Sequence, residues 1–174
     1  MLKALLKTMR PKQWAKNVFL LAAVVFDRKL TNTDAMLHTL LGVIAFSLVA
    51  SVVYITNDIA DVEADREHPI KRKRPIAAGK LPIPVAWGAV VILLLVAFPV
   101  AYWLSPSFAF VTLFYLLLNL TYSKWIKHTA LLDIIVLASF YVIRVAAGVA
   151  LINVERFSPW IYIFTTFLAL LMGT

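Results

Sequence analysis

Cysteine is absent from this sequence, and charged residues occupy only 15% of its 174 positions. Without cysteine the chain has neither a disulfide framework nor thiol chemistry. The scarcity of charge, together with 62% hydrophobic residues, excludes an ordinary soluble domain, in which about 25% of residues are charged and about 45–50% are apolar. We therefore expect an integral membrane protein with no separate soluble domain.

Long apolar runs occupy most of the chain. A helix that crosses a hydrocarbon core of about 30 Å needs about 20 mainly apolar residues, and we expect six such spans, at residues 14–27, 37–57, 83–104, 107–123, 130–152 and 159–173. The first run is short and follows a basic segment, as in a signal peptide, but five further spans favour a retained helix. The expected fold class is all-α: a polytopic transmembrane helical bundle, in one domain over residues 1–174. Because the sixth run meets the chain end without polar flanking residues, we expect the sequence to be truncated there.

A net charge of +8 is compatible with nucleic-acid binding, but the positions of the basic residues favour a membrane topology instead. Thirteen of the 17 lysines and arginines lie in the N-terminal arm, in residues 58–82 and in residues 119–129, whereas three lie in the alternate connections. The positive-inside rule places the N-terminus and both loops in the cytoplasm, where the two loops should form one site. We expect the lipid bilayer and no nucleic acid as partner. The sequence indicates no oligomeric state.

An acidic motif closes the second apolar run. If one helix continues through it, Asp58, Asp61 and Asp65 share a face, with Asn57 one turn before Asp61. Like charges at these spacings near a helix C-terminus are unfavourable, and a bound cation relieves them. Oxygen ligands without histidine or cysteine suit a hard ion, so we predict that Asp58, Asp61 and Asp65 bind Mg²⁺. The alternative is a solvated helix end that only pairs with neighbouring cations.

A basic segment from Lys71 to Arg74 follows the acidic motif. Such residues are common in cytoplasmic loops, where they also contact anionic lipid headgroups. Arg74 is the strongest candidate for binding a substrate phosphate, because Pro75 and Gly79 turn the loop beside it and a guanidinium binds phosphate bidentately. Lys73 is a second candidate.

Polar residues also gather at the end of the fourth apolar run and within the fifth. Asn119, Tyr122 and Lys127 lie on one face of a helix, although a tyrosine at a membrane interface is ordinarily an anchor. Arg144 lies inside an apolar run, where ionisable groups face the bundle interior or a cavity and are functional by default. Asp133 is a second such group, about three turns away.

Asn57, Asp58, Asp61 and Asp65 form the pattern N-D-x-x-D-x-x-x-D, which resembles the first acidic motif of the UbiA superfamily of intramembrane prenyltransferases. The chain is most similar to the decaprenyl-phosphate phosphoribosyltransferase branch of that superfamily. Three groups of residues carry this similarity: Arg10-Pro11-Lys12-Gln13-Trp14 with Lys16-Asn17, residues 65–79, and Tyr141 with Arg144 and Ala147-Gly148.

The resemblance implies a bundle of about nine transmembrane helices, of which this chain supplies six, around a central cavity with Mg²⁺ and a diphosphate at its cytoplasmic mouth. For the branch, it implies Mg²⁺-dependent transfer of 5-phosphoribose from phosphoribosyl diphosphate to a polyprenyl phosphate of the decaprenyl type. Diphosphate is released, and the product serves cell-envelope polysaccharide precursor synthesis. Asp58 and Asp61 would then hold the metal, and Asp65 would serve the metal or the ribose hydroxyls.

The expected substrate-binding residues are Asn57, Lys16, Lys73, Arg74, Tyr122, Lys127 and Arg144. Lys73 and Arg74 would stabilise the negative charge that builds on the departing diphosphate. The lipid phosphate is already an anion and needs orientation more than a general base, a role that suits Lys16, Lys127 and Arg144.

Other functions share parts of this pattern. A UbiA-type prenyltransferase that moves a polyprenyl group from its diphosphate to an aromatic acceptor uses the same first motif, and a second acidic motif in the rest of the gene would favour it. A non-catalytic transporter needs charge along a path across the bilayer, whereas charge here gathers at one face. The CDP-alcohol phosphotransferases place Gly after a motif Asp, but here Asp61 precedes Val62 and Asp65 precedes Arg66.

Overall fold

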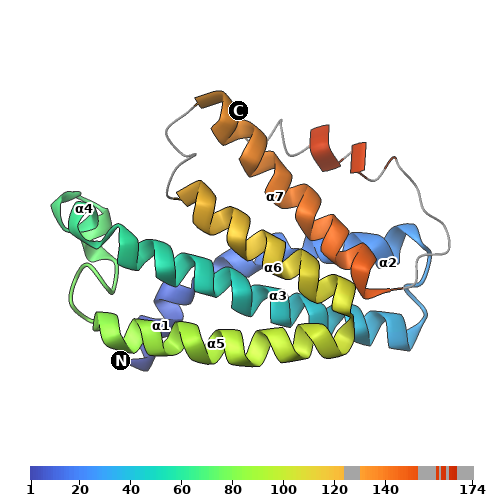
Figure 1. The fold of residues 1–174 in the computed structure, drawn as a ribbon, viewed down its shortest axis with the longest axis horizontal. Coiled ribbons are helices and arrows are strands. Elements are labelled where there is room, and N and C mark those ends of the chain that lie inside the picture. Colours follow the sequence, from blue (N-terminus) through green and yellow to red (C-terminus); the bar gives the residue numbers. More distant parts are fainter. Residues whose placement is uncertain (124–129, 153–159, 161, 164, 168–174) are drawn as a thin grey trace.

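The computed structural model describes residues 1–123, 130–152, 160, 162, 163 and 165–167, and these residues form helices and turns without a strand among them. The all-α prediction is confirmed. In chain order the elements are α1 (Leu2–Met9), the 3₁₀ helix η1 (Pro11–Leu21), α2 (Ala22–Phe26), α3 (Thr33–Ala60), α4 (Val62–Glu67), the 3₁₀ helix η2 (Lys71–Lys73), α5 (Ile83–Leu104), α6 (Pro106–Thr121) and α7 (Ala130–Leu151) (Figure 1).

Most of the expected spans correspond to helices. α3 and α5 are long and apolar enough to cross a membrane, and the apolar helices Pro106–Thr121 and Ile135–Leu151 are shorter. α5 coincides with the span expected at residues 83–104, whereas α3 extends the second expected span at both ends. The span expected at residues 159–173 lies largely outside the described residues.

The first expected span differs from the prediction, because it begins at Pro11 and its first eleven residues are 3₁₀ helix rather than α-helix. In a 3₁₀ helix, side chains three positions apart line up along one face. Trp14 Nε1 donates to Ser51 Oγ at 3.0 Å, and Asn17 Nδ2 donates to Ser47 Oγ at 2.9 Å. Trp14 and Asn17, three positions apart on one face of η1, thus bond to two serines on one face of α3 and hold the two elements together.

The ends of α5 and α6 are formed by the turn residues that the sequence predicts. Pro82 is the N-cap of α5, in extended conformation. Ser105 ends α5 and caps α6, where its Oγ accepts a hydrogen bond from Phe108 N. Pro106 occupies the first position of α6, where its missing N–H costs no hydrogen bond. The result is a tight hairpin.

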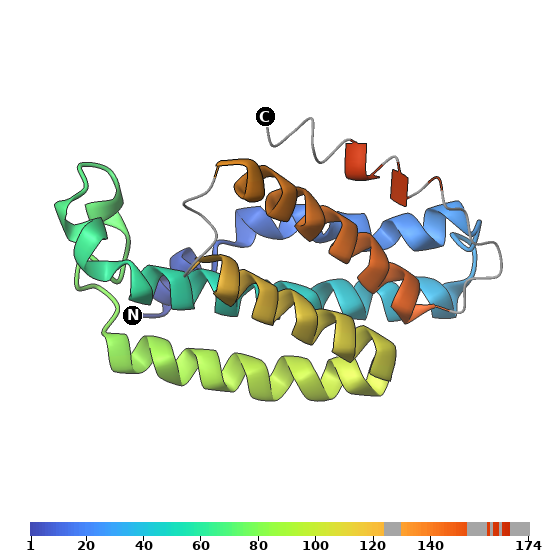
Figure 2. The ribbon, with the colours of Figure 1, turned by 45° about the horizontal axis from the view of Figure 1, so that its top comes forward.

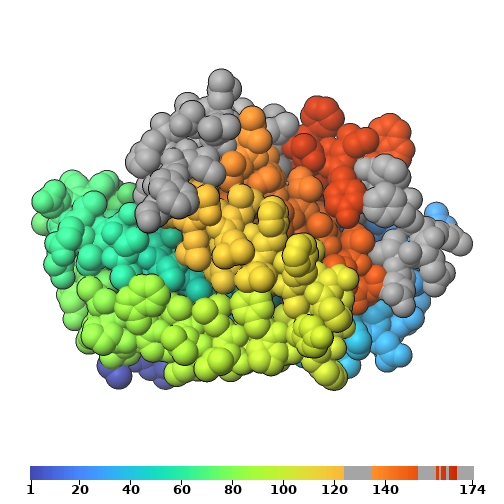
Figure 3. Space-filling view, in the orientation of Figure 1, coloured from blue at the N-terminus to red at the C-terminus, as the bar shows by residue number. Residues whose placement is uncertain are grey.

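α3 is the central helix of the bundle. It packs against α5 and η1 and also contacts α1, α6 and α7, and its Phe46, Val49 and Ile55 are fully buried. α5 runs along one edge of the molecule (Figure 3) and exposes large apolar side chains on its outer side: Trp87, Val91, Ile92, Leu95, Val96 and Trp103. A continuous apolar surface of this kind suits contact with lipid.

The two ends of the bundle differ (Figure 2). At one end, α4, η2 and the loop into α5 project beyond the long helices, and this end carries the acidic motif. At the other end, α2 and the start of α3 lie near the α5–α6 hairpin. The N-terminal helix α1 packs on α3, so the basic N-terminal arm is held close to the bundle.

Candidate functional site

The acidic motif does not lie on one uninterrupted helix. α3 ends one residue before Asp61, which adopts φ −91° and ψ 9°, and α4 begins one residue after it. The condition for one shared helical face of Asp58, Asp61 and Asp65 is therefore not met. Asp58 and Asp65 nevertheless stay close together, because both contact the same atom of Arg74.

Two arginines neutralise the carboxylates of Asp58 and Asp65. Arg10 Nη2 donates to Asp58 Oδ1 at 2.6 Å. Arg74 Nη1 lies 2.7 Å from Asp65 Oδ2 and 3.3 Å from Asp58 Oδ1. The two aspartate side chains are 2% exposed, whereas those of Arg10 and Arg74 are 33% and 27% exposed. A solvent-borne anion can therefore reach the guanidinium groups while the carboxylates stay covered.

The loop after η2 sets the position of Arg74. Ile76 and Leu81 are buried and anchor this loop, and the carbonyl of Pro75 accepts hydrogen bonds from two successive N–H groups, at 2.9 and 3.1 Å. Gly79 has φ 71°, a conformation that glycine adopts without steric cost. The predicted turn at Pro75 and Gly79 is confirmed, and it holds Arg74 against the acidic motif.

A cavity of about 320 Å³, here called the central cavity, lies next to this motif. Four predicted substrate-binding residues line it, namely Lys16, Asn57, Tyr122 and Arg144. They come from η1, the end of α3, the end of α6 and α7, so the fold brings together residues far apart in the sequence. The other lining residues are Val53, Tyr54, Tyr115, Asn119, Leu137, Phe140 and Tyr141. The described lining thus contains two cations and no acid.

Arg144 is the buried cation of the central cavity. Its Nε donates to Asn17 Oδ1 at 3.0 Å, its Nη1 to the carbonyl of Phe140 at 2.8 Å and its Nη2 to Tyr115 Oη at 3.3 Å. The guanidinium also lies 5.3 and 5.5 Å from the ring centroids of Tyr115 and Tyr141. Within the described part of the chain no carboxylate forms an ion pair with it. The prediction that Arg144 faces the interior is confirmed, and a buried charge with neutral partners favours an anion beside it.

The sequence pattern does not single out Arg10, Tyr54 or Tyr115 as site residues. Tyr54 precedes Asp58 by four positions and Tyr115 precedes Asn119 by four, so the helical repeat places each pair on one face. That spacing is a usable signal. The contact between Arg10 and Asp58 joins residues 48 positions apart, and no local pattern indicates it.

The other predicted site residues do not line the central cavity in the described part of the chain. Asp61 is partly buried at the junction of α3 and α4. Lys73 lines a separate surface pocket. Lys127 and the side chain of Asp133 lie outside the described residues.

The oxygen chemistry of the motif fits a magnesium ion. Among the residues that the structure describes, no three histidine, cysteine or acidic residues are grouped as a metal cage. Asp58 and Asp65, however, both lie within 3.3 Å of the same Arg74 atom, so one positive group already bridges the two carboxylates. Mg²⁺ is commonly held by one or two carboxylates, water and substrate phosphates, a demand that this pair can meet.

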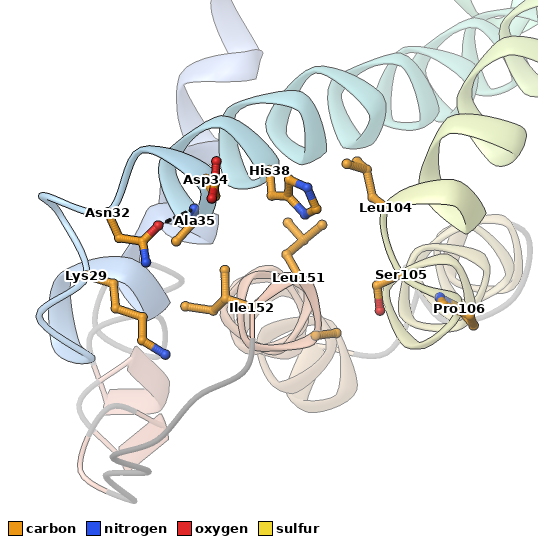
Figure 4. A pocket seen from close by; sticks show the side chains of 11 residues that line it. Lys29, Asn32, Asp34, Ala35, His38, Leu104, Ser105, Pro106, Leu151 and Ile152 are labelled. Atoms are coloured by element: carbon orange, nitrogen blue, oxygen red, sulfur yellow. Dashed lines mark hydrogen bonds between the residues drawn. The ribbon is translucent and has the colours of Figure 1, made fainter.

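A larger cavity, of about 530 Å³, lies at the opposite end of α3. Figure 4 shows Lys29, Asp34 and His38 around it, with Ser105 from the α5–α6 hairpin. No residue predicted to bind metal or substrate lines this cavity. We therefore assign the candidate site to the acidic motif and the central cavity.

The fold and the site define a class of protein: an apolar helical bundle with an acidic motif beside a cavity that contains cations. The chain belongs to the UbiA prenyltransferase family, whose model matches residues 18–174, and the resemblance to that family is thereby confirmed. It is an integral membrane protein, as members of that family are.

Individual relatives agree with this assignment. The chain is 39% identical over 170 residues to the decaprenyl-phosphate phosphoribosyltransferase of Mycobacterium tuberculosis, a match that covers 95% of this chain and 56% of the relative. It is 35% identical to the enzyme of that name from Corynebacterium glutamicum, over 98% of this chain and 52% of the relative. The chain thus spans about half the length of the curated relatives it matches.

A solved structure shows the same fold. The UbiA homologue from Archaeoglobus fulgidus bound to GPP and Mg²⁺ aligns with a TM-score of 0.79 at 23% identity, over 97% of this chain and 60% of the homologue.

Proposed function

We propose that the full-length gene product transfers 5-phosphoribose from phosphoribosyl diphosphate to a polyprenyl phosphate and releases diphosphate, with Mg²⁺ as cofactor. Two relatives at 35–39% identity, both decaprenyl-phosphate phosphoribosyltransferases, support this reaction. The observation that carries it is the buried Arg144, a cation with neutral partners in a cavity with no acidic residue in its described lining. Such a cavity suits an anionic acceptor better than a neutral one, and a polyprenyl phosphate is an anion.

The donor would bind at the acidic motif. Asp58, Asp65 and Asp61 would hold Mg²⁺, which neutralises charge on the departing diphosphate when bound. Arg74 contacts both buried carboxylates and is partly exposed, so a substrate phosphate can compete with them for its guanidinium. Lys73, farther out on the same loop, would add a second cation.

The acceptor phosphate would bind in the central cavity. Arg144 and Lys16 line it, and Lys127 would complete the set from the following connection. An oxygen of the lipid phosphate then attacks the anomeric carbon of the ribose as the bond from that carbon to diphosphate breaks. Asn57 and Tyr122, which also line the cavity, would contact the sugar.

We also propose that the acidic motif and the N-terminus face the cytoplasm of a bacterial cell. The positive-inside rule supports this orientation, and phosphoribosyl diphosphate is a soluble donor that would have to be available on that side. The product would feed the synthesis of cell-envelope polysaccharide precursors.

Aromatic prenylation is the second candidate. Tyrosines line much of the central cavity and could stack on an aromatic acceptor, and the solved homologue from Archaeoglobus fulgidus is bound to GPP and Mg²⁺. That reaction has fewer phosphate groups to balance, because it brings one diphosphate and one aromatic carboxylate, whereas phosphoribosyl transfer brings a diphosphate, a 5-phosphate and a lipid phosphate.

The two functions are separated by paired assays on the full-length gene product in nanodiscs. One assay supplies radiolabelled phosphoribosyl diphosphate with polyprenyl phosphate; the other supplies a radiolabelled prenyl diphosphate with hydroxybenzoate or dihydroxynaphthoate. We expect Mg²⁺-dependent transfer of label into the lipid fraction in the first assay. Prenylated aromatic product in the second assay alone would overturn the proposal in favour of aromatic prenylation.

A further inference from the structure

A surface pocket of about 480 Å³, here called the lysine pocket, lies outside the central cavity. Its lining residues are Met1, Lys3, Ala4, Lys7, Lys73, Pro75 and Lys80. Four of these seven residues are lysines, none is acidic, and none also lines the central cavity. The reaction proposed above uses Lys73 alone among them, so the remaining lysines need a separate explanation.

The lysines of this pocket come from two segments distant in the sequence. Lys3 and Lys7 lie one turn apart on α1, and Lys73 and Lys80 lie at the two ends of the loop that carries Arg74. Like charges at i and i+4 repel, and folding adds the loop lysines to the same space. Ala4 gives the pocket an apolar wall that can cover lysine methylenes while the ammonium groups stay hydrated. An anion in the pocket would relieve the repulsion from both segments at once.

The surroundings of the pocket are those of a membrane interface. Leu2 and Leu6 are 71% and 45% exposed, and the helical repeat places them in a stripe beside the Lys3 and Lys7 stripe. Lys80 lies three residues before α5, which is long and apolar enough to span a membrane. The exposed Trp87 follows one turn into α5, as aromatic residues do at the headgroup level.

We propose that the lysine pocket binds the phosphate headgroup of an anionic phospholipid, with α1 lying in the membrane interface and Leu2 and Leu6 in contact with the acyl chains. A soluble phosphate compound would neutralise the lysines but leave those two leucines in water. A zwitterionic lipid would bury the leucines but add a positive charge next to the lysines. An anionic phospholipid matches both features.

The bound lipid would also act on the acidic motif. α1 ends at Met9, and its C-cap Arg10 has φ 53°, an uncommon conformation for a residue other than glycine. From there its side chain reaches Asp58 at 2.6 Å. A headgroup that fixes α1 therefore fixes the residue that neutralises Asp58. The lipid site itself does not depend on which substrates the protein uses.

The test is a binding titration of the full-length gene product in detergent with dioctanoyl phosphatidylglycerol, dioctanoyl phosphatidylcholine and sodium phosphate. We expect saturable binding of the phosphatidylglycerol, and binding at least about tenfold weaker for the other two compounds. The double variant Lys3→Gln/Lys7→Gln should weaken phosphatidylglycerol binding by about tenfold or more, since each lysine contributes roughly fivefold. Leu6→Ser should weaken binding of the lipid and leave that of phosphate unchanged.

A matched control removes two cations from the same end of the protein outside the pocket. Lys12→Gln/Arg66→Gln carries the same charge change, and neither residue lines the lysine pocket; its affinity should stay within about twofold of the parent. An equal loss in both double variants would show nonspecific attraction and overturn the proposal. Sodium phosphate that binds as tightly as the lipid would also overturn it. If Lys3→Gln/Lys7→Gln does not fold, Lys80→Gln makes the same test from the loop, and an unchanged affinity there contradicts the proposal.

Discussion

Asp58 is the residue on which the charges of the site converge. It lies at the end of an apolar helix with 2% of its side chain exposed, and guanidinium groups from two different segments reach the same carboxylate oxygen. A buried carboxylate without such partners would be strongly unfavourable. The two arginines therefore stabilise the charged form of Asp58. A metal ion that replaced one of them would find a carboxylate ligand already in position.

Asp58→Asn removes the charge and keeps the shape. We expect Mg²⁺-dependent turnover of the full-length gene product to fall by about 100-fold or more, the size of loss seen when one electrostatic contact to a transition state is removed. The variant should still fold, because the amide oxygen can accept one of the two arginine contacts. The measurement is turnover against Mg²⁺ concentration. Asp34→Asn, at the exposed start of the same helix, is the control and should match the parent; an unchanged Mg²⁺ dependence in Asp58→Asn contradicts the metal assignment.

Arg74→Gln tests the donor side of the site. Loss of one charge-assisted hydrogen bond costs about 1.5–3 kcal/mol, so the KM for phosphoribosyl diphosphate should rise by about 10- to 100-fold while the KM for the lipid changes little. Arg66→Gln is the control, because Arg66 pairs with exposed Glu63 at the surface. Equal kinetics for Arg74→Gln and Arg66→Gln would show that Arg74 serves only the two aspartates.

Arg144→Gln tests the acceptor side. The glutamine can still bond Asn17 or Tyr115, but the cavity loses its buried positive charge. The KM for polyprenyl phosphate should rise by about tenfold or more, by the same estimate for a charged contact, and the KM for phosphoribosyl diphosphate should stay close to the parent value. The reverse pattern, a changed donor KM alone, would move Arg144 to the other substrate.

At the scale of elements, regular features are predictable from the sequence and irregular ones are not. α5 and the α5–α6 hairpin follow from an apolar run between prolines and a serine cap, because these signals are local. The 3₁₀ geometry of η1 is not predictable in this way, since it results from matching Trp14 and Asn17 to serines on α3. The break in the helix at Asp61 also depends on tertiary context, because Asp65, after the break, pairs with Arg74 from a separate loop. The predicted residues share one cavity because η1, α3, α6 and α7 pack around it. The spacing of residues within one element cannot predict how separate elements pack.

The contact of α7 with η1 gives a prediction at the same scale. A Cβ added at Gly148 would overlap the backbone carbonyl of Leu20, whereas one added at Gly42 would meet only the flexible side chain of Leu151. Gly148→Ala should therefore destabilise the protein by about 1–3 kcal/mol and disturb the Asn17–Arg144 bond across the same contact. Gly42→Ala should be close to neutral, because alanine favours the helix and Leu151 can move. Thermal unfolding in detergent compares the two; equal melting temperatures would show that η1 shifts away from α7 without cost.

At the scale of the whole molecule, the chemistry is gathered at one end of an apolar bundle. The acidic motif, the central cavity and the lysine pocket all lie toward the end formed by α4, η2 and the start of α5. The other end carries the α5–α6 hairpin and the larger cavity (Figure 4). The sequence predicts this difference between the two ends from its basic residues, because the numbers of lysines and arginines in the connections do not depend on how the helices pack.

That polarity implies that the two ends of α5 lie on opposite sides of the membrane. Its 22 residues span about 33 Å at 1.5 Å each, enough for a hydrocarbon core of about 30 Å.

These 174 residues contain no cysteine, so single cysteines introduced among them report individual positions. Ala78→Cys, just before α5, should react with a membrane-impermeant maleimide only in inverted vesicles. Ser105→Cys, after α5, and Thr31→Cys, before α3, should react only in right-side-out cells. Thr31 is the internal control, because its neighbour Asn32 lines the same cavity as Ser105. Reaction of Ala78→Cys and Ser105→Cys from one side would refute the spanning of α5 and, with it, the cytoplasmic assignment of the acidic motif.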